Sequence, residues 1–345
     1  MSGRIDRLRE LLEEPLLVTS AANVRYLTGL RSSNAALLVE PERAVLYTDF
    51  RYAEAARAVA GVEAVETTRS LLADLAGRLG GRIGFEAAHV TYAGYETLAS
   101  GGLELVPRRG LVESVRAVKE AEELAAIAHA AHAAEHAFEA LVREPWVGRT
   151  ERDAAWRLEE LMHANGAQGV SFEVIVASGP NGALPHARPT DRTIGSDELV
   201  VVDFGCVLDG YCSDCTRTVA TGRPTEELRR AYAACLAAQE AAVEGIRAGL
   251  SGVDADRLAR DPIEAAGFGD AFGHGLGHGV GLEVHEAPTL STVSTDTLAV
   301  GNIVTIEPGI YLPGRGGVRI EDLCVVREDG VESFTTFRKD LIAVD

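Results

Sequence analysis

The feature that most constrains the fold is a predicted β-hairpin in residues 198–220, ELVVVDFGCVLDGYCSDCTRTVA. An Asp209-Gly210 pair stands between two runs of β-prone residues, which is a strong signal for a two-residue hairpin turn. We therefore pair Leu208 with Tyr211 and continue the two strands antiparallel from there. This pairing decides which side chains share a face, because alternate residues of a strand point to opposite faces of the sheet.

The predicted hairpin brings two carboxylates together. In its register Gly205 lies opposite Asp214, and Asp203 shares a face with Gly205. Asp203 and Asp214 are then diagonal cross-strand neighbours, with Cβ atoms about 7 Å apart. On an exposed face both would simply be solvated, but the apolar run around Asp203 favours burial. Because two buried like charges repel each other, we expect a cation between them.

A second pair of carboxylates follows the same pattern later in the chain. Residues 301–311, GNIVTIEPGIY, and 317–326, GVRIEDLCVV, have the pattern of two strands around a loop rich in proline and glycine. This hairpin would bring Glu307 and Glu321 together.

The segment 272–286, FGHGLGHGVGLEVHE, combines three histidines with glycine at every second position from residue 273 to residue 281. His274 and His278 have the spacing of a helical zinc site, but each glycine disfavours a helix by about 1 kcal/mol. In an extended strand the two rings point the same way and stand about 13 Å apart, so only one can bind a given ion. His285 needs a bend to join them. Alternating glycines suit the close approach of another backbone or of a substrate, and we do not interpret the overlapping GxGxxG pattern as a nucleotide site.

Three helices are predicted in the second part of the chain. Residues 118–143 are rich in Ala, Leu and Glu and contain no Gly or Pro, which predicts one long helix. A second helix is predicted from a capping signal at Thr150 to a stop at Asn165-Gly166, and a third around residues 226–248. Three histidines share one face of the first helix, and we interpret them as solvated rather than as a metal cluster: His129, His132 and His136.

The chain is predicted to form two domains. Its 345 residues are enough for two hydrophobic cores. The first hundred residues alternate strand-like runs with helical stretches, which is typical of a small α/β domain, whereas residues 170–219 and 299–327 are rich in predicted strand. We place the amino-terminal domain at residues 1–113 and the carboxy-terminal domain at residues 114–345, in an α+β protein.

Charge and cysteine content exclude several function classes. A formal net charge of −19 disfavours nucleic acid and anionic lipid as partners. The charged start, MSGRIDRLRELLEE, is unlike a signal peptide, and no run approaches the roughly 18 apolar residues of a membrane span, so we expect a cytoplasmic protein. The five cysteines are too few and too irregular for a disulfide framework. We interpret the CxxC pair of Cys212 and Cys215 as small buried strand residues, because no helix start follows to activate a thiol.

Taken in order, these segments resemble the dinuclear metallopeptidases of the pita-bread fold, in particular the Xaa-Pro peptidases prolidase and aminopeptidase P. The resemblance covers essentially the whole chain and rests on VVVDFGCVLDGYCSDCTRT, HGLGHGVGLEVHE, VTIEPGIY and GVRIED, with ASGPNGALPHARP upstream. The segments NVRYLTGL and LYTDFRYAEAA are similar to the smaller domain of that family. The resemblance implies a carboxy-terminal pita-bread (creatinase/aminopeptidase-like) catalytic domain and a smaller amino-terminal creatinase-like α/β domain.

The resemblance also assigns roles to particular residues. It implies two divalent metal ions per chain, of which Asp214 and Glu321 are shared ligands. The complete implied ligand set is Asp203, Asp214, His278, Glu307 and Glu321. The residues implied to contact substrate or to support catalysis are His186, His274 and His285. The residues implied to line the site or to orient its ligands are Tyr311 and Arg319.

The implied reaction is the hydrolysis of Xaa-Pro peptide bonds by a metal-bridged hydroxide, with Glu307 as general acid/base. One imidazole among carboxylates is compatible with manganese, cobalt, iron or zinc. The compact length resembles short microbial prolidases and favours a dipeptidase acting on Xaa-Pro substrates. The smaller domain resembles those that mediate dimer contacts in the family, which implies a homodimer.

Several alternatives stay open at this point. Aminopeptidase P would remove the first residue from Xaa-Pro-Yaa peptides; methionine aminopeptidase, which usually lacks the extra domain, ranks behind it. A non-catalytic pita-bread peptide-binding module is also conceivable, but such proteins typically have replaced ligand positions. Some prolidases have an arginine shortly after the VHE-x-P motif that meets the product carboxylate, whereas this chain has Thr289 there; the substitutes we considered are Arg315 and Arg31.

Overall fold

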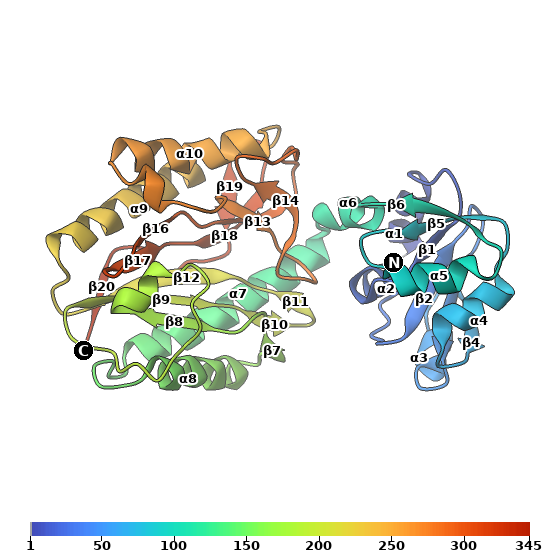
Figure 1. Cartoon of the computed structure of the whole chain (residues 1–345), viewed down its shortest axis with the longest axis horizontal. Helices are drawn as coiled ribbons and strands as arrows, with labels where there is room; N and C mark the ends of the chain where they lie inside the picture. Colours follow the sequence, from blue (N-terminus) through green and yellow to red (C-terminus); the bar gives the residue numbers. More distant parts are fainter. Residues whose placement is uncertain (1) are drawn as a thin grey trace. The chain divides into compact units, whose positions relative to one another are not determined.

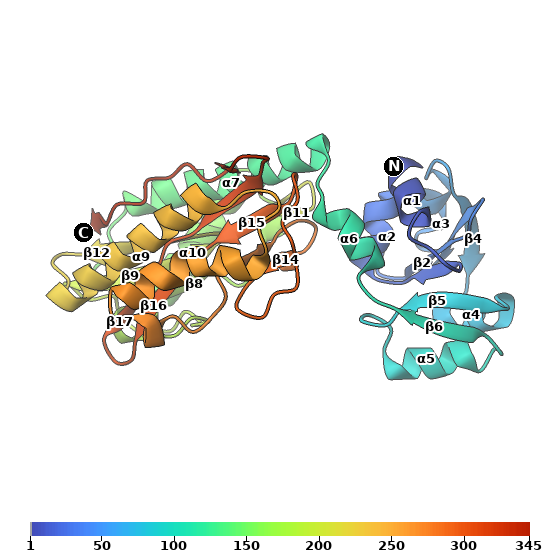
Figure 2. The same cartoon turned by 90° about the horizontal axis from the view of Figure 1, so that it is seen from above.

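A computed structural model describes residues 2–345 and divides the chain into two compact units, Met1–Arg116 and Ala117–Asp345 (Figures 1 and 2). The division falls at the end of helix α6 (Leu111–Ala117). The boundary expected from the sequence, after residue 113, lies inside the same helix.

The amino-terminal unit is a six-stranded mixed sheet with helices on its faces, in the strand order β4-β3-β2-β1-β5-β6. Its strands are β1 (Leu16–Val18), β2 (Ala35–Val39), β3 (Ala44–Asp49), β4 (Glu63–Thr67), β5 (Arg82–Glu86) and β6 (Glu104–Arg108). Its other helices are α1 (Ser2–Arg9), α2 (Ala21–Thr28), α3 (Ala53–Arg57), α4 (Leu71–Arg78) and α5 (Tyr92–Ala99). Leucines of α4 and α5 form a core with one face of the sheet, and α1 lies on the opposite face (Figure 2). This is the small α/β domain that the sequence predicts.

The carboxy-terminal unit contains four long helices and several short sheets. The helices are α7 (Ala121–Val142), α8 (Glu151–Ala164), α9 (Glu226–Gly245) and α10 (Gly252–Ala265), with short 3-10 turns η1 (Gly179–Ala183) and η2 (Gly269–Ala271). The strands of its first half are β7 (Gly169–Val170), β8 (Ile175–Ser178), β9 (Glu198–Phe204), β10 (Cys206–Leu208), β11 (Tyr211–Cys212) and β12 (Cys215–Thr221). The strands of its second half are β13 (Gly277–Gly279), β14 (Glu286–Leu290), β15 (Ile303–Ile306), β16 (Gly309–Leu312), β17 (Gly316–Arg319), β18 (Asp322–Val326), β19 (Val331–Ser333) and β20 (Ile342–Val344).

These strands lie between two pairs of helices (Figure 1). Helices α7 and α8 share a core with the sheet β20-β12-β9-β8. Helices α9 and α10 share a second core with the sheet β14-β13-β15-β18-β19 and the ribbon β16-β17. The strand ends that carry the predicted site residues are thereby held between two packed layers.

Both predicted hairpins are present, and the first has the predicted register. Leu208 pairs with Tyr211, and Asp203 pairs with Thr216. The turn residues Asp209 and Gly210 have positive φ angles of 48° and 81°, as a type I′ turn requires. The second hairpin runs from β15 paired with β18 into β16 paired with β17.

All three helices predicted in the second part of the chain are present, and the one predicted at residues 118–143 is α7. The Thr150 hydroxyl accepts a hydrogen bond from the Asp153 amide at 3.0 Å, so it caps α8 as expected. The expected helix at 226–248 is α9. Helix α10 was not predicted, and it contains Pro262, a residue that disfavours a helix interior. The three histidines of α7 are exposed, in agreement with a solvated face: His129, His132 and His136.

The five cysteines are buried, and burial of Cys212 and Cys215 confirms the prediction for that pair. Burial raises the pKa of the Cys206 and Cys212 thiols to about 11, so neither resembles a reactive thiolate. None of the helices between residues 2 and 345 combines the length and the apolar character that crossing a membrane requires.

Candidate metal centre

Three carboxylates converge where the two hairpins meet. Asp203, Asp214 and Glu321 each place one oxygen within 4.8 Å of the other two. Two of the hydrogen bonds that join the hairpins link Thr216 with Glu321: the Thr216 hydroxyl donates to Glu321 Oε2 at 2.7 Å, and the Glu321 amide donates to the Thr216 carbonyl at 3.1 Å. The proximity of Asp203 and Asp214 is the geometry that the hairpin register predicts.

The carboxylate group has the properties of a cation site. Among the described residues, Asp203 Oδ1 and Glu321 Oε1 are buried oxygens with no hydrogen-bond partner. Burial, together with the charges of neighbouring carboxylates, raises the pKa of Asp203, Asp214 and Glu321. Leaving a buried acceptor unsatisfied costs about 1–3 kcal/mol, and more for a charged one. Divalent cations with a preference for oxygen ligands fit this donor set.

His278 and Glu307 extend the carboxylate group. His278 Nε2 lies 3.3 Å from Glu307 Oε1 and 3.7 Å from Asp214 Oδ2. His278 Nδ1 lies 3.0 Å from the carbonyl oxygen of Gly279, which can only accept, so Nδ1 carries a hydrogen and Nε2 faces the carboxylates. Burial favours the neutral ring, but Glu307 outweighs it and raises the pKa of His278. Burial likewise opposes ionisation of Glu307, but the hydrogen bond with His278 prevails and lowers its pKa to about 2.

The alternating glycines permit the close packing that presents His278. A Cβ atom on Gly277 would lie 2.0 Å from the Thr305 carbonyl oxygen, and one on Gly279 would lie 2.2 Å from that of Ala287. Any side chain at these positions would push β13 away from its neighbours β15 and β14. The prediction that the glycines serve a close backbone approach is confirmed.

His274 lies outside the carboxylate group, at one end of a hydrogen-bond chain that reaches Asp203. His274 Nε2 is 2.9 Å from the Tyr311 hydroxyl, which accepts from Arg319 Nη1 at 2.8 Å. Arg319 Nη2 then donates to Asp203 Oδ2 at 2.5 Å. Arg319 therefore holds Oδ2 of Asp203, whereas Oδ1 is the oxygen without a hydrogen-bond partner. Burial raises the pKa of Tyr311 to about 12 and lowers that of His274, so both are neutral at pH 7.

A bend between β13 and β14 brings His285 against His278, as the sequence requires. Their ring centroids are 4.4 Å apart in an edge-to-face arrangement. The Glu286 carboxylate stabilises the bend by accepting from the Glu283 amide at 3.1 Å. Its other oxygen lies 3.2 Å from Lys119 Nζ, and both side chains of this ion pair are almost fully buried, 1% and 6% exposed.

A cavity of about 480 Å³ surrounds these groups. The predicted site residues that line it are His186, Asp203, Asp214, His274, His278, His285, Glu307, Arg319 and Glu321. Tyr311 is not among the lining residues and contacts them through His274 and Arg319.

Sequence reasoning missed two charged residues of the cavity, Glu173 and Arg188. Arg188 stands two residues after His186 in LPHARP, and its closeness in sequence to a predicted site residue was the available signal. Arg315, which the sequence offered as a carboxylate partner, is not a lining residue and pairs with Glu227 of α9.

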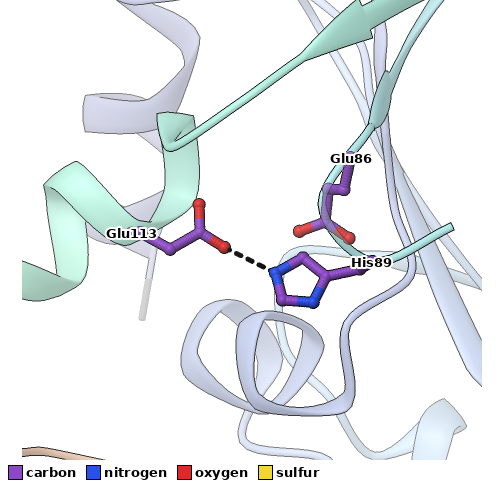
Figure 3. A group of neighbouring side chains, drawn as sticks. All are labelled: Glu86, His89 and Glu113. Carbon is purple, nitrogen blue, oxygen red and sulfur yellow. Dashed lines mark hydrogen bonds and ion pairs between the residues drawn. The ribbon is translucent and has the colours of Figure 1, made fainter. Parts of the chain in front are cut away.

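The amino-terminal unit holds a second group of metal-ligand side chains, Glu86, His89 and Glu113 (Figure 3). Here the protein itself satisfies the oxygens. Glu86 accepts from the Ser20 amide at 2.7 Å and the Asn23 side chain at 2.5 Å, and Glu113 accepts from Asn23 at 2.7 Å. We therefore interpret this group as a network that joins β5, α2 and α6.

Comparisons with known proteins agree with the two-unit organisation. The model of Metallopeptidase family M24 matches residues 125–328, and that of the Creatinase/Prolidase N-terminal domain matches residues 4–118. An uncharacterized peptidase of Bacillus subtilis, YqhT, is 42% identical over 98% of this chain and 99% of its own length.

Two solved structures are similar along the whole chain. The Xaa-Pro dipeptidase from Bacillus anthracis is 39% identical with a TM-score of 0.95, covering 99% of both chains. The X-Pro aminopeptidase from Thermotoga maritima is 33% identical with a TM-score of 0.89, covering 98% of this chain and 100% of that one.

Proposed function

The chain belongs to metallopeptidase family M24, and from this premise we propose that it is a Xaa-Pro dipeptidase that requires divalent metal ions. The observation that carries the proposal is the buried group of three carboxylates in the cavity, whose unpartnered oxygens need a cation. The substrate class is supported by the similarity to the Bacillus anthracis structure named Xaa-Pro dipeptidase.

We propose that two divalent ions bind in the cavity, with the carboxylates of Asp214 and Glu321 shared between them. The ligands in this proposal are Asp203, Asp214, His278, Glu307 and Glu321. Four carboxylates neutralise the charge of two divalent cations, and one imidazole among them is compatible with manganese, cobalt, iron or zinc. When bound, the ions lower the pKa of a water molecule and polarise the carbonyl group of the scissile bond.

Glu307 is the residue that moves the proton in this proposal. The Thr305 hydroxyl donates to Glu307 Oε1 at 3.0 Å, and His278 contacts the same oxygen. Glu307 Oε2 is then the oxygen that takes a proton from the attacking water and delivers it to the leaving proline nitrogen. In the metal-free protein the hydrogen bond with His278 lowers the pKa of Glu307 to about 2, so this carboxylate is ionised at neutral pH.

The three remaining histidines of the cavity are proposed to contact the peptide: His186, His274 and His285. The Tyr311 hydroxyl fixes the orientation of His274, and the bend before Glu286 fixes that of His285. Desolvation lowers the pKa of both rings, although His285 is itself an exposed residue, so they contact the peptide as neutral groups.

The cavity suits a short peptide that contains proline. Its volume of about 480 Å³ lies within the range of sites for small ligands. Phe172, Ile175 and Leu290 add apolar surface for a pyrrolidine ring. An Xaa-Pro bond has no N–H and a fixed φ, so a site shaped for proline gains selectivity from the ring rather than from a backbone hydrogen bond.

The test is a comparison of three substrates. Protein treated with EDTA and then supplied with Mn²⁺ should hydrolyse Xaa-Pro dipeptides faster than Xaa-Pro-Yaa tripeptides or dipeptides without proline. Hydrolysis of Xaa-Pro at an unchanged rate in EDTA would refute the metal requirement. Cleavage of dipeptides with no preference for proline would refute the substrate class.

Aminopeptidase P activity is the second candidate, because the Thermotoga maritima structure named X-Pro aminopeptidase is similar over nearly the whole chain. A faster reaction with Xaa-Pro-Yaa than with Xaa-Pro would favour it.

The homodimer stays a prediction of the family resemblance. Light scattering measures the mass of the assembly, and a mass near 36.6 kDa, that of one chain, would contradict the dimer.

A further inference from the structure

One basic residue of the cavity, Arg188, has no role in the proposed metal site. Arg188 and Arg319 are the arginines among the described lining residues, and no lysine accompanies them. The same lining contains five carboxylates: Glu173, Asp203, Asp214, Glu307 and Glu321. A dipeptide carries a negative carboxylate one residue beyond the scissile bond. Such a ligand needs a basic group that can turn towards it.

Arg319 is already committed to the protein. Its Nε donates to the Thr216 hydroxyl at 3.1 Å, and its Nη1 donates to the Pro185 carbonyl at 3.1 Å and to the Tyr311 hydroxyl. Its Nη2 holds Asp203. The residue is 4% exposed. Turning Arg319 towards a substrate would break its hydrogen bond with Asp203, a proposed metal ligand.

Arg188 has the opposite character. It lies in the loop between η1 and β9, and its side chain is 83% exposed although the residue lines the cavity. Its ion pair with Glu173 has an Nε to Oε2 distance of 3.4 Å, and Glu173 is itself 62% exposed. An exposed pair at this distance contributes about 0–1 kcal/mol, so a ligand carboxylate can replace Glu173 at little cost.

We propose that Arg188 binds the carboxy-terminal carboxylate of a Xaa-Pro dipeptide and thereby selects dipeptides over longer peptides. The planar guanidinium matches a carboxylate with two parallel hydrogen bonds, which a peptide bond at the same place does not offer. In the free protein Glu173 occupies this partner position. The proposal rests on the proposed dipeptidase function, and it replaces Arg315 as the carboxylate partner.

The test uses a dipeptide and its amide, for example Ala-Pro and Ala-Pro-amide, which differ only in the charge of the terminal group. Arg188→Gln should raise KM for Ala-Pro about tenfold or more, since a hydrogen bond to a charged group is lost. Its kcat for Ala-Pro and both constants for the amide should stay within about twofold of the wild-type values. Arg188→Lys should recover part of the loss.

Two matched variants control for general effects on the cavity. Glu173→Gln removes the competing carboxylate and should lower KM for Ala-Pro without changing that for the amide. Arg315→Gln removes an arginine that pairs with Glu227 outside the cavity lining and should change neither substrate. Equal effects of Arg188→Gln on acid and amide, or none on either, would overturn the proposal.

A binding experiment separates failure of this inference from failure of the proposed function. Calorimetric titration of Ala-Pro into the Glu307→Gln protein and into the double variant with Arg188→Gln measures carboxylate recognition without turnover. Weaker binding by the double variant supports the role of Arg188 in carboxylate recognition, even if the wild-type protein hydrolyses some other peptide. Equal binding by both proteins refutes the role of Arg188, even if Xaa-Pro hydrolysis is observed.

Discussion

Asp214→Asn should stabilise the metal-free protein, although it removes a proposed metal ligand. Asp214 is 5% exposed, and its nearest oxygen lies within 4.8 Å of the oxygens of Asp203 and Glu321. At an effective dielectric constant of about 20, two unit charges 4.8 Å apart repel each other by about 3 kcal/mol. Protonating Asp214 would remove this repulsion. Keeping a carboxyl with an ordinary pKa near 3.9 neutral at pH 7 costs about 4 kcal/mol, so this cost sets an upper limit on the destabilisation. After subtracting the attraction between Asp214 and His278, we expect a gain of about 2 kcal/mol.

The pH dependence of this gain has a definite sign. Burial and the neighbouring carboxylates raise the pKa of Asp214 in the folded protein. The folded state therefore binds more protons than the unfolded state, and stability falls as pH rises from about 4 through the raised pKa. Near pH 4 Asp214 is largely protonated in the folded state and about half protonated in the unfolded state, so the gain from Asp214→Asn should be small. It should be largest at pH 7 and above.

Urea unfolding in EDTA, followed by circular dichroism at pH 7 and pH 4, measures this gain. Asp329→Asn is the matched control, because Asp329 is an exposed carboxylate in the loop between β18 and β19. With Mn²⁺ present the order should reverse, since only the wild-type protein keeps the complete proposed ligand set. If Asp214→Asn destabilises the metal-free protein at pH 7, or matches Asp329→Asn, the reasoning about repulsion is wrong.

Two further substitutions test the proton carrier and the bend that carries His285. Glu307→Gln should keep the circular dichroism spectrum and lower kcat by a factor of about 10² to 10⁴, as expected for loss of a general acid/base; a rate near that of the wild type would remove Glu307 from this role. Lys119→Met should lower the free energy of unfolding by about 3–5 kcal/mol, because it removes the ammonium group that pairs with the buried Glu286 carboxylate. The double variant with Glu286→Gln should recover part of that loss, and additive losses in urea unfolding would contradict the coupling.

The hairpins show what could be predicted from the sequence. Turn chemistry at Asp209-Gly210 and the two-residue period of a strand are local properties, so they determined the pairing of Asp203 with Thr216 across the turn. The glycines around His278 predicted a close backbone approach for the same reason, since only short-range sterics are involved.

Other features depend on contacts between distant segments and could not be read locally. Glu173 and Arg188 meet only because the loop before β8 and the loop before β9 lie together in the folded chain. Lys119 and Glu286 are 167 residues apart. Helix α10 forms despite Pro262 because Ala255, Ala259 and Ile263 join the core that α9 also lines, and this packing outweighs the local preference.

The central claim is that the buried carboxylates are tolerated because metal ions bind among them. The most direct test measures metal content by mass spectrometry alongside Xaa-Pro hydrolysis, on protein saturated with Mn²⁺ and then freed of excess ion. The account predicts about two ions per chain, a parallel loss of metal and activity in EDTA, and recovery of both when the metal is restored. Full activity in protein that contains no bound metal would contradict it.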